Sequence, residues 1–359
     1  MLHNLCLYHK MLVQLKQWLP GERVTRLRNM ALLMTGLYAS MNIHLSKITS
    51  EWPMGGRLVS LTNRLRRWLS NQAIVVSDWY EPLARELVGR LGQTRLRLVM
   101  DISKVGGNTR MLMIGLAYRK RVLPLGWRIL QGRKGHAAEH VQLDLLNEVS
   151  RLLPEGVRVW LMADAGFQSV KVMRWVCKQG WPFVFRQPGN VTLFPQGQAA
   201  VLFQAIPIRK GHTHVVGWVH FTARHQFGLL WAVVHWDASA DEPWFLVSNV
   251  AHTPSLLRQY ACRMWIEETF GDMKQHGFDL EATHLSDPDR ISRLVLAVSM
   301  TFVWFVALGT WVVKNSFRYL IDRKDRRDKS FFRLGWDWLH HAERNALSLP
   351  VRFLPVPSN

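Results

Sequence analysis

LRLVMDIS, at residues 96–103, is the first of three short β-type runs that decide the fold of this chain. RMLMIGLAYR (110–119) and VLPLGWRIL (122–130) follow it, and turn residues separate the three runs. The apolar residues in this region do not recur at helical spacing. We therefore expect three consecutive strands.

Helices and strands alternate after these runs. Residues 136–153 and 169–179 favour helices, whereas VRVWLMAD (157–164) and WPFVFR (181–186) are typical of strands. Three strands followed by helix, strand, helix and strand is the order of the ribonuclease-H-like fold, although other α/β folds share parts of it. We therefore expect an α/β protein with a ribonuclease-H-like core.

The segments around this core differ from it in pattern. Apolar side chains recur at helical spacing before residue 92, whereas residues 191–250 hold short β-type runs without a helical period. We expect a basic, helical N-terminal domain at 1–92, the first part of the core at 93–190, a β-rich insertion at 191–250, the rest of the core at 251–318, and a C-terminal segment at 319–359.

The composition points to a polyanionic partner. The 359 residues include 46 Lys and Arg against 26 Asp and Glu, a net charge of +20, and nucleic acid is the first candidate for such a protein. Residues 1–190 carry most of the excess, whereas residues 191–250 hold as many acidic as basic side chains. A hydrophobic content of 48% with 17 Trp excludes a disordered basic tail.

The sequence also indicates the cellular compartment in which the protein is expected. Three scattered cysteines exclude a disulfide framework and a cysteine-rich zinc site, and they suit a reducing cytoplasm. The first 20 residues lack the pattern of a secretory signal. Leu294–Val313 carries no charge and is long enough to span a membrane, but it contains Ser299 and Thr301 and is the only such stretch. We expect a buried core helix there, and no membrane association.

Two aspartates follow apolar runs of the expected core. Asp101 ends the first run and Asp164 ends VRVWLMAD, so we expect each at the C-terminal end of its strand. Ligands gather at that edge of open α/β sheets. An aspartate in this position can equally cap a turn or the next helix. A third carboxylate converging on the pair would favour a site.

The expected helix at 253–274 supplies such a carboxylate. Tyr260, Arg263, Glu267 and Lys274 fall within about 60° of arc at 100° per residue, so they form one stripe. Glu268 lies away from it. The stripe can be a solvated face with an Arg263–Glu267 ion pair. It would also suit a phosphate backbone laid along the helix, with Glu267 holding a metal ion.

YACRMWIEETFGDMK, residues 260–274, resembles the Y-x2-R-x3-E-x6-K signature of the DDE transposases of bacterial insertion sequences, in the large fourth insertion-sequence family. All four signature positions match, and Asp101 and Asp164 resemble the family's two aspartates. One position departs: Ala165 stands where the family usually has Arg. The resemblance covers about residues 95–310.

The resemblance implies a mechanism. Asp101, Asp164 and Glu267 would be the catalytic residues and would bind two Mg²⁺ or Mn²⁺ ions per active site. Water would cleave the phosphodiester at the element ends, and the 3′-OH would then attack target DNA. The partners would be double-stranded DNA, as terminal inverted repeats and target, and a second copy of the chain. The location would be the bacterial cytoplasm, at the nucleoid.

The DNA contacts implied or expected come from three places. Tyr260, Arg263 and Lys274 of the signature would grip phosphates beside the cut. Trp244, in PWFLVSN, resembles the family position on which a flipped base stacks, although it can equally be a core aromatic of the insertion. Four arginines uninterrupted by acidic residues are candidates for reading the inverted repeat: Arg57, Arg64, Arg66 and Arg67.

Two rival functions share these features. A domesticated or inactive transposase would only bind DNA, and the Ala165 departure keeps that alternative open. A ribonuclease-H-like nuclease would cut without joining. The end sequence, the target preference and the excision route, through a hairpin or otherwise, are not encoded in any recognisable motif.

Overall fold

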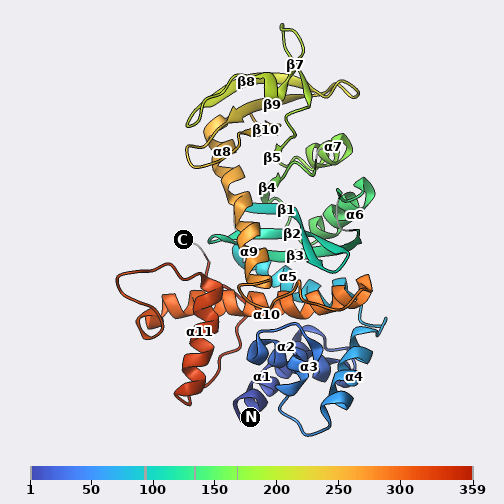
Figure 1. The fold of residues 1–359 in the computed structure, drawn as a ribbon, viewed down its shortest axis with the longest axis vertical. Coiled ribbons are helices and arrows are strands. Elements are labelled where there is room, and N and C mark those ends of the chain that lie inside the picture. Colours follow the sequence, from blue (N-terminus) through green and yellow to red (C-terminus); the bar gives the residue numbers. More distant parts are fainter. Residues whose placement is uncertain (1, 93–94, 133–134, 168, 358–359) are drawn as a thin grey trace.

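The computed structural model describes residues 2–92, 95–132, 135–167 and 169–357 (Figure 1). Its centre is a ten-stranded sheet in the order β3-β2-β1-β4-β5-β10-β9-β8-β6-β7. The first five strands are β1 (Arg95–Gly106), β2 (Thr109–Tyr118), β3 (Arg121–Gln131), β4 (Arg158–Ala163) and β5 (Phe183–Arg186). β1 pairs antiparallel with β2 and parallel with β4, which pairs parallel with β5. This mixed α/β sheet agrees with the expected ribonuclease-H-like core.

Two helices make the crossovers that parallel strands require. α6 (Glu139–Ser150) connects β3 to β4, and α7 (Val170–Lys178) connects β4 to β5. Ser169 caps α7, because its hydroxyl accepts a hydrogen bond from the Val172 N–H. α6 packs against β3 and β2 through a buried apolar face. These crossovers hold β1, β4 and β5 in register.

The segment at 191–250 continues the same sheet. It contributes β6 (Thr192–Pro195), β7 (Val201–Leu202), the short helix η1 (Phe203–Ala205), β8 (Thr213–Phe221), β9 (Phe227–His235) and β10 (Trp244–Ser248). β10 pairs antiparallel with β5, so the added strands extend the core sheet at its β5 edge. They form the end of the molecule farthest from α1–α4 (Figure 1).

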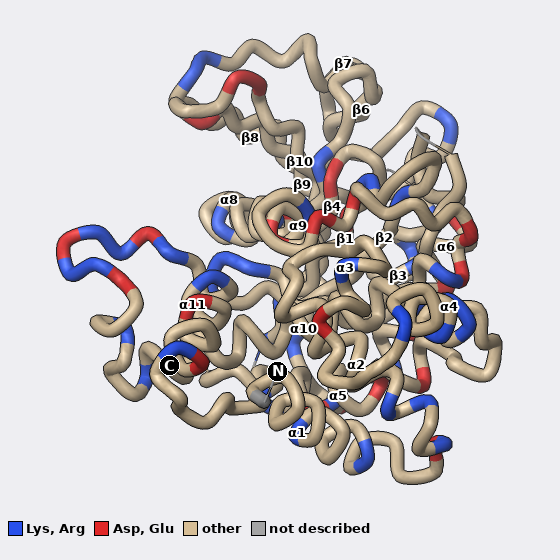
Figure 2. The backbone as a smooth tube through the Cα atoms, turned by 60° about the horizontal axis from the view of Figure 1, so that its bottom comes forward, with Lys and Arg blue, Asp and Glu red and all other residues tan. Residues whose placement is uncertain are grey.

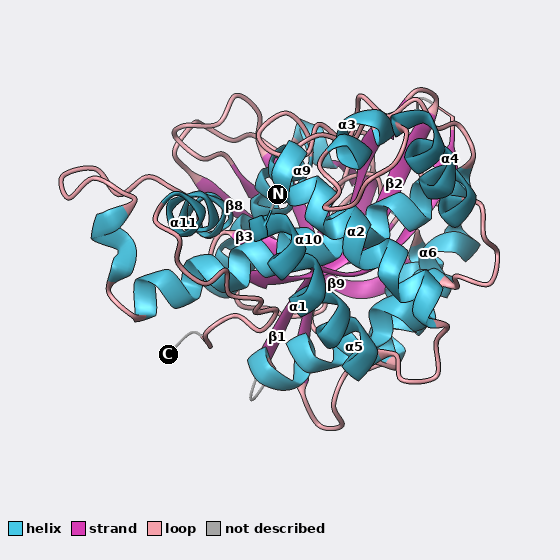
Figure 3. Cartoon of the chain, turned by 90° about the horizontal axis from the view of Figure 1, so that it is seen from below, coloured by secondary structure: helices cyan, strands magenta, loops and turns pink. Residues whose placement is uncertain are grey.

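The N-terminal residues form five helices: α1 (Leu2–Trp18), α2 (Val24–Ser40), α3 (Leu45–Ser50), α4 (Leu58–Leu69) and α5 (Val76–Leu91). They do not stand apart from the core. α10 (Pro288–Lys314) contacts β3 on one side and α2, α4 and α5 on others. Figure 1 shows α10 between the sheet and the helices α1–α4, and Figure 3, seen from below, shows α2 alongside α10. A continuous set of buried apolar side chains joins these layers.

α10 is the one described helix that is long and apolar enough to cross a membrane, and 94% of its most apolar window is buried inside the protein. It contains the stretch for which we predicted a core helix. After η3 (Phe317–Leu320) the chain returns along it in α11 (Phe331–Arg344). The backbones of α10 and α11 pack so closely that only glycine fits at two positions. A Cβ added to Gly309 would lie 1.9 Å from the carbonyl oxygen of Phe331, and a Cβ added to Gly335 would lie 1.9 Å from the carbonyl oxygen of Phe305.

Candidate active site

Asp101 and Asp164 lie on neighbouring parallel strands. β1 and β4 pair in register up to Met100 and Ala163, and each aspartate is the next residue along the chain. Asp164 follows the end of β4, as expected. Asp101 does not end β1, because β1 continues to Gly106 in its pairing with β2. Asp101 therefore does not lie at the end of β1, so that prediction is wrong. Asp101 does lie where the pairing of β1 with β4 ends.

The expected helix at 253–274 is interrupted. The structure has α8 (Thr253–Ala261), a single 3₁₀ turn η2 (Cys262–Met264) and α9 (Trp265–Met273). The 3₁₀ turn holds Arg263, and both β1 and β4 contact η2. Four apolar side chains of the same segment lie in the core: Cys262, Ile266, Phe270 and Met273.

Arg263 joins the three predicted catalytic carboxylates. Its Nη2 lies 2.9 Å from Asp101 Oδ2 and 3.2 Å from Asp164 Oδ2, and its Nη1 lies 2.6 Å from Glu267 Oε1. The Arg263 side chain is 7% exposed. The Arg263–Glu267 ion pair therefore forms between a buried guanidinium and a carboxylate that is 50% exposed, whereas the simpler alternative placed both side chains in solvent. Acidic positions gather where β4 and α9 lie close together (Figure 2).

Burial and charge set the protonation of this cluster. Burial would lower the pKa of the Arg263 guanidinium, but Asp101 and Asp164 raise it above its ordinary value. Burial raises the pKa of Asp101 to about 6, against the lowering by Arg263 and by the Ile102 N–H, which donates to Asp101 Oδ1 at 2.7 Å. The nearby charges of Asp164 and Glu267 add to the rise. Arg263 thus lowers the pKa of Asp101, but burial is the larger effect.

Tyr260 and Trp244 lie beside this cluster. The buried Tyr260 hydroxyl donates to Asp164 Oδ1 at 3.1 Å, and burial raises its pKa above the ordinary value. The half-buried Trp244, at the start of β10, meets the Tyr260 ring edge to face, with centroids 4.9 Å apart. The aromatic pair thus connects the strands of the 191–250 segment to Asp164.

Lys274 lies at the other end of α9. Its Nζ donates to Ser103 Oγ at 2.7 Å and pairs with Glu281 at 2.8 Å. Ser103 is two residues beyond Asp101 on β1, so Lys274 lies along the same strand but bonds to none of the three carboxylates. Its expected phosphate contact stays a prediction.

Arg186 is a residue that the sequence did not single out. It ends β5, and its guanidinium lies 3.9 Å from Asp164 Oδ1 and 3.3 Å from Glu242 Oε2. Arg186 therefore places a positive charge near Asp164, although the neighbouring Ala165 has no charged side chain. In the sequence, Arg186 is visible as the last residue of the expected strand at 181–186. Only the pairing of β5 with β4 shows that it lies near Asp164.

The four N-terminal arginines lie at and along α4. Arg57 precedes α4, and Arg57, Arg66 and Arg67 are exposed. Arg64 is half-buried and donates from Nε to Asn29 Oδ1 at 2.7 Å. Arg64 and Arg67 line a cavity of about 290 Å³ whose wall includes two further arginines, Arg23 and Arg26. The predicted DNA contacts of this group stay predictions.

The donor set suits a hard divalent cation, since Mg²⁺ and Mn²⁺ prefer carboxylate oxygens. In the described part of the chain, no three such side chains stand close enough to share one ion. The Arg263 guanidinium lies between them instead, so the three carboxylates already converge on one positive charge. The three carboxylates would fit a metal ion only if that guanidinium moved away from them.

Comparison with known families decides the class. The model described as "Transposase DDE domain" matches residues 104–304, more than half of the chain. The chain belongs to the DDE transposase family. No curated protein matches it. Among solved structures, that of a piggyBac transposase synaptic complex with hairpin DNA is similar at a TM-score of 0.44 and 11% identity, covering 98% of this chain and 84% of that one. So weak a likeness carries no argument about this transposase.

Proposed function

We propose that this DDE transposase belongs to the YREK group of the fourth insertion-sequence family, binds the terminal inverted repeats of its element, cleaves their ends and joins the 3′-OH ends to target DNA. One observation carries the proposal: Arg263 draws Asp101, Asp164 and Glu267, from two strands and a helix, to a single point. Arg263 and Asp101 are buried, and a buried ion pair is weak evidence of a gain in stability, so this convergence favours a functional role.

The three carboxylates would hold two Mg²⁺ or Mn²⁺ ions. The ions, when bound, activate the attacking oxygen and stabilise the leaving oxygen of a phosphodiester. Arg263 then exchanges its carboxylate partners for phosphate oxygens, and its Nε, buried and without a partner among the described residues, supplies one further donor. Tyr260, held by Asp164, orients that carboxylate.

Trp244 would receive a base displaced from the duplex beside the cut. Its ring is half-buried and already lies against Tyr260, so a base stacked on it would sit next to the catalytic carboxylates. The β-rich insertion would serve chiefly to place this ring. The net charge of residues 191–250 is zero, so stacking rather than charge would hold DNA there.

The N-terminal helices would form the domain that recognises the element end, through Arg57, Arg64, Arg66 and Arg67. Arg23 and Arg26 extend this basic surface from α2. Two copies of the chain would act together on the paired ends, in the bacterial cytoplasm at the nucleoid. The protein would have no membrane partner, in keeping with the burial of α10.

A strand-transfer assay tests the proposal. The purified protein is incubated with Mg²⁺, a labelled duplex carrying the element end and a supercoiled target plasmid. Joining of the label to the plasmid is the expected result. Cleavage without joining would support a nuclease, and binding alone would support a domesticated DNA-binding protein. An Arg66→Ala/Arg67→Ala variant should lose preference for the element end over a scrambled duplex, whereas Arg85→Ala on α5 should retain it.

A further inference from the structure

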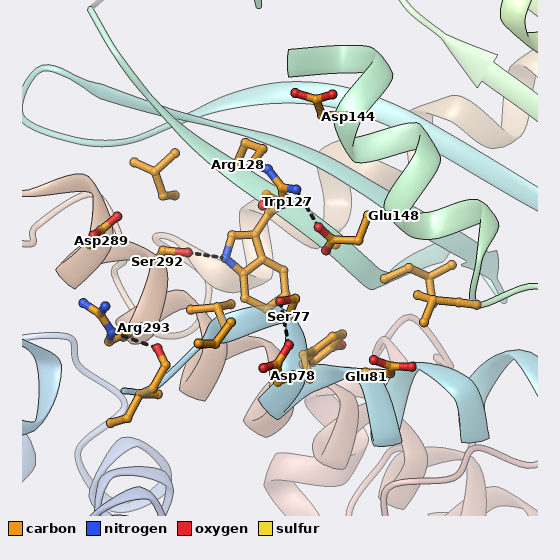
Figure 4. A pocket seen from close by; sticks show the side chains of 18 of the residues that line it. Ser77, Asp78, Glu81, Trp127, Arg128, Asp144, Glu148, Asp289, Ser292 and Arg293 are labelled. Carbon is orange, nitrogen blue, oxygen red and sulfur yellow. Dashed lines mark hydrogen bonds and ion pairs between the residues drawn. The ribbon is translucent and has the colours of Figure 1, made fainter. Parts of the chain in front are cut away.

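Two large cavities on this transposase are each lined by four arginines, but they differ in charge. The first, of about 820 Å³ between α5, β3, α6 and α10, also holds five acidic side chains (Figure 4). Two of its arginines are paired with them, Arg128 with Glu148 and Arg85 with Glu81. This cavity is close to neutral and has no evident affinity for a polyanion.

The second cavity, of about 990 Å³, is strongly basic. Its arginines are Arg90, Arg95, Arg97 and Arg158, with Glu155 as the only acidic residue in the lining. None of the four arginines forms an ion pair within the part of the chain that the structure describes. Arg90, Arg95 and Arg158 are exposed, and Arg97 is half-buried. Unneutralised arginines in a groove create a positive potential that a polyanion would relieve.

The groove lies on the same face of the sheet as the catalytic aspartates. Arg95 pairs with Arg158 at the start of β1 and β4, and each arginine is six residues before an aspartate, Asp101 or Asp164. Side chains an even number of residues apart on a strand point to the same face. At about 3.3 Å per residue, the arginine pair is about 20 Å from the aspartate pair.

Two hydrogen bonds on adjacent residues connect the groove to the carboxylate cluster. Arg97, between the two pairs on β1, donates from Nε to Gln259 Oε1 at 2.7 Å. Gln259 is buried and precedes Tyr260, whose hydroxyl holds Asp164. The basic groove and the carboxylate cluster are thus linked inside the protein through Arg97, Gln259 and Tyr260.

We propose that this second basic groove binds the phosphate backbone of the double-stranded DNA that enters the active site, about six base pairs from the cut at 3.4 Å per base pair. The inference rests on the proposed function, because it takes DNA to be the substrate. Arg90, Arg95 and Arg158 would thus contact DNA at a place separate from the contacts of the signature residues and of the arginines at α4. Arg97, fixed by Gln259, positions the groove relative to Tyr260.

The test is the salt dependence of DNA binding by the full chain. Fluorescence anisotropy with a labelled 30-base-pair duplex is measured in EDTA, so that no cleavage occurs. Arg95→Ala/Arg158→Ala should flatten the slope of log affinity against log salt by about 1.8, since each phosphate contact contributes about 0.9. Arg95→Lys/Arg158→Lys should restore most of the slope, because the charges return.

The matched control is Arg85→Ala/Arg151→Ala, which removes two arginines from the neutral cavity. If both double variants change the slope equally, or if the groove variant changes nothing while it melts at the wild-type temperature, the inference is wrong. Its failure is distinct from failure of the proposed function. A protein that binds through the groove but neither cuts nor joins would retain this inference and lose the other.

Discussion

Arg263 Nη2 lies 2.9 Å from Asp101 Oδ2, and both side chains are buried. The same guanidinium also contacts Asp164 and Glu267, so one cation pairs with all three carboxylates on which the proposed chemistry depends. Removing any member of this cluster should therefore affect both catalysis and stability. The predictions below separate the two effects.

Replacing Asp101, Asp164 or Glu267 by Ala should abolish DNA cleavage while gel-shift binding to the element end persists. Each change removes a carboxylate that the proposed metal ions require, but no contact to distant DNA. Glu268→Ala is the control, because Glu268 is the next residue on α9 and its side chain is 61% exposed. Cleavage that survived any one of the three changes would refute the catalytic assignment.

Arg263→Ala should lower the free energy of unfolding by about 3–5 kcal/mol, the usual cost of leaving buried charges without a partner. Chemical denaturation at neutral pH measures this. If Arg263 also grips a phosphate, the salt slope of DNA binding should flatten by about 0.9. An unchanged slope together with the loss of stability would mean that Arg263 acts only within the carboxylate cluster.

Asp101 should make the metal-free protein less stable as the pH rises from about 4 to about 6. Its pKa is raised from 3.8 to about 6 in the folded chain, so the folded state binds more protons than the unfolded state in that window. The stabilising contribution is complete below pH 3.8 and is lost as the pH rises through 6. Denaturant titrations in EDTA at several pH values should show this fall in the wild type, relative to Asp101→Asn. Parallel curves for the two proteins would contradict the shifted pKa.

Trp244→Ala should weaken binding to an element end with an unpaired base beside the cut by about 1–3 kcal/mol, the usual worth of one base stacked on an aromatic ring. Trp244→Phe should retain most of the affinity. Trp218→Ala serves as the control, because Trp218 lies on β8 and packs edge to face against Trp231. Equal losses for Trp218 and Trp244 would assign both rings to the sheet core.

Local sequence was sufficient for much of this fold. The three β-type runs became β1, β2 and β3, the residues with helical spacing before residue 92 became α1–α5, and the apolar stretch at 294–313 became part of the buried helix α10. These outcomes follow from periodicity, which depends on neighbours in the chain. The Tyr260–Glu267 spacing also identified the residues that gather at the candidate site.

Only the tertiary structure decided how that site is held. Helical geometry placed Arg263 and Glu267 one turn apart, but the 3₁₀ turn η2 and the parallel register of β1 with β4 determined that Arg263 meets both aspartates. The nearby Arg186 and the basic groove depend in the same way on which strands become neighbours. The sequence by itself thus determined which residue types recur at which spacing. Strand pairing decided which charges meet, because it brings together residues 22 positions or more apart and local spacing carries no record of that pairing.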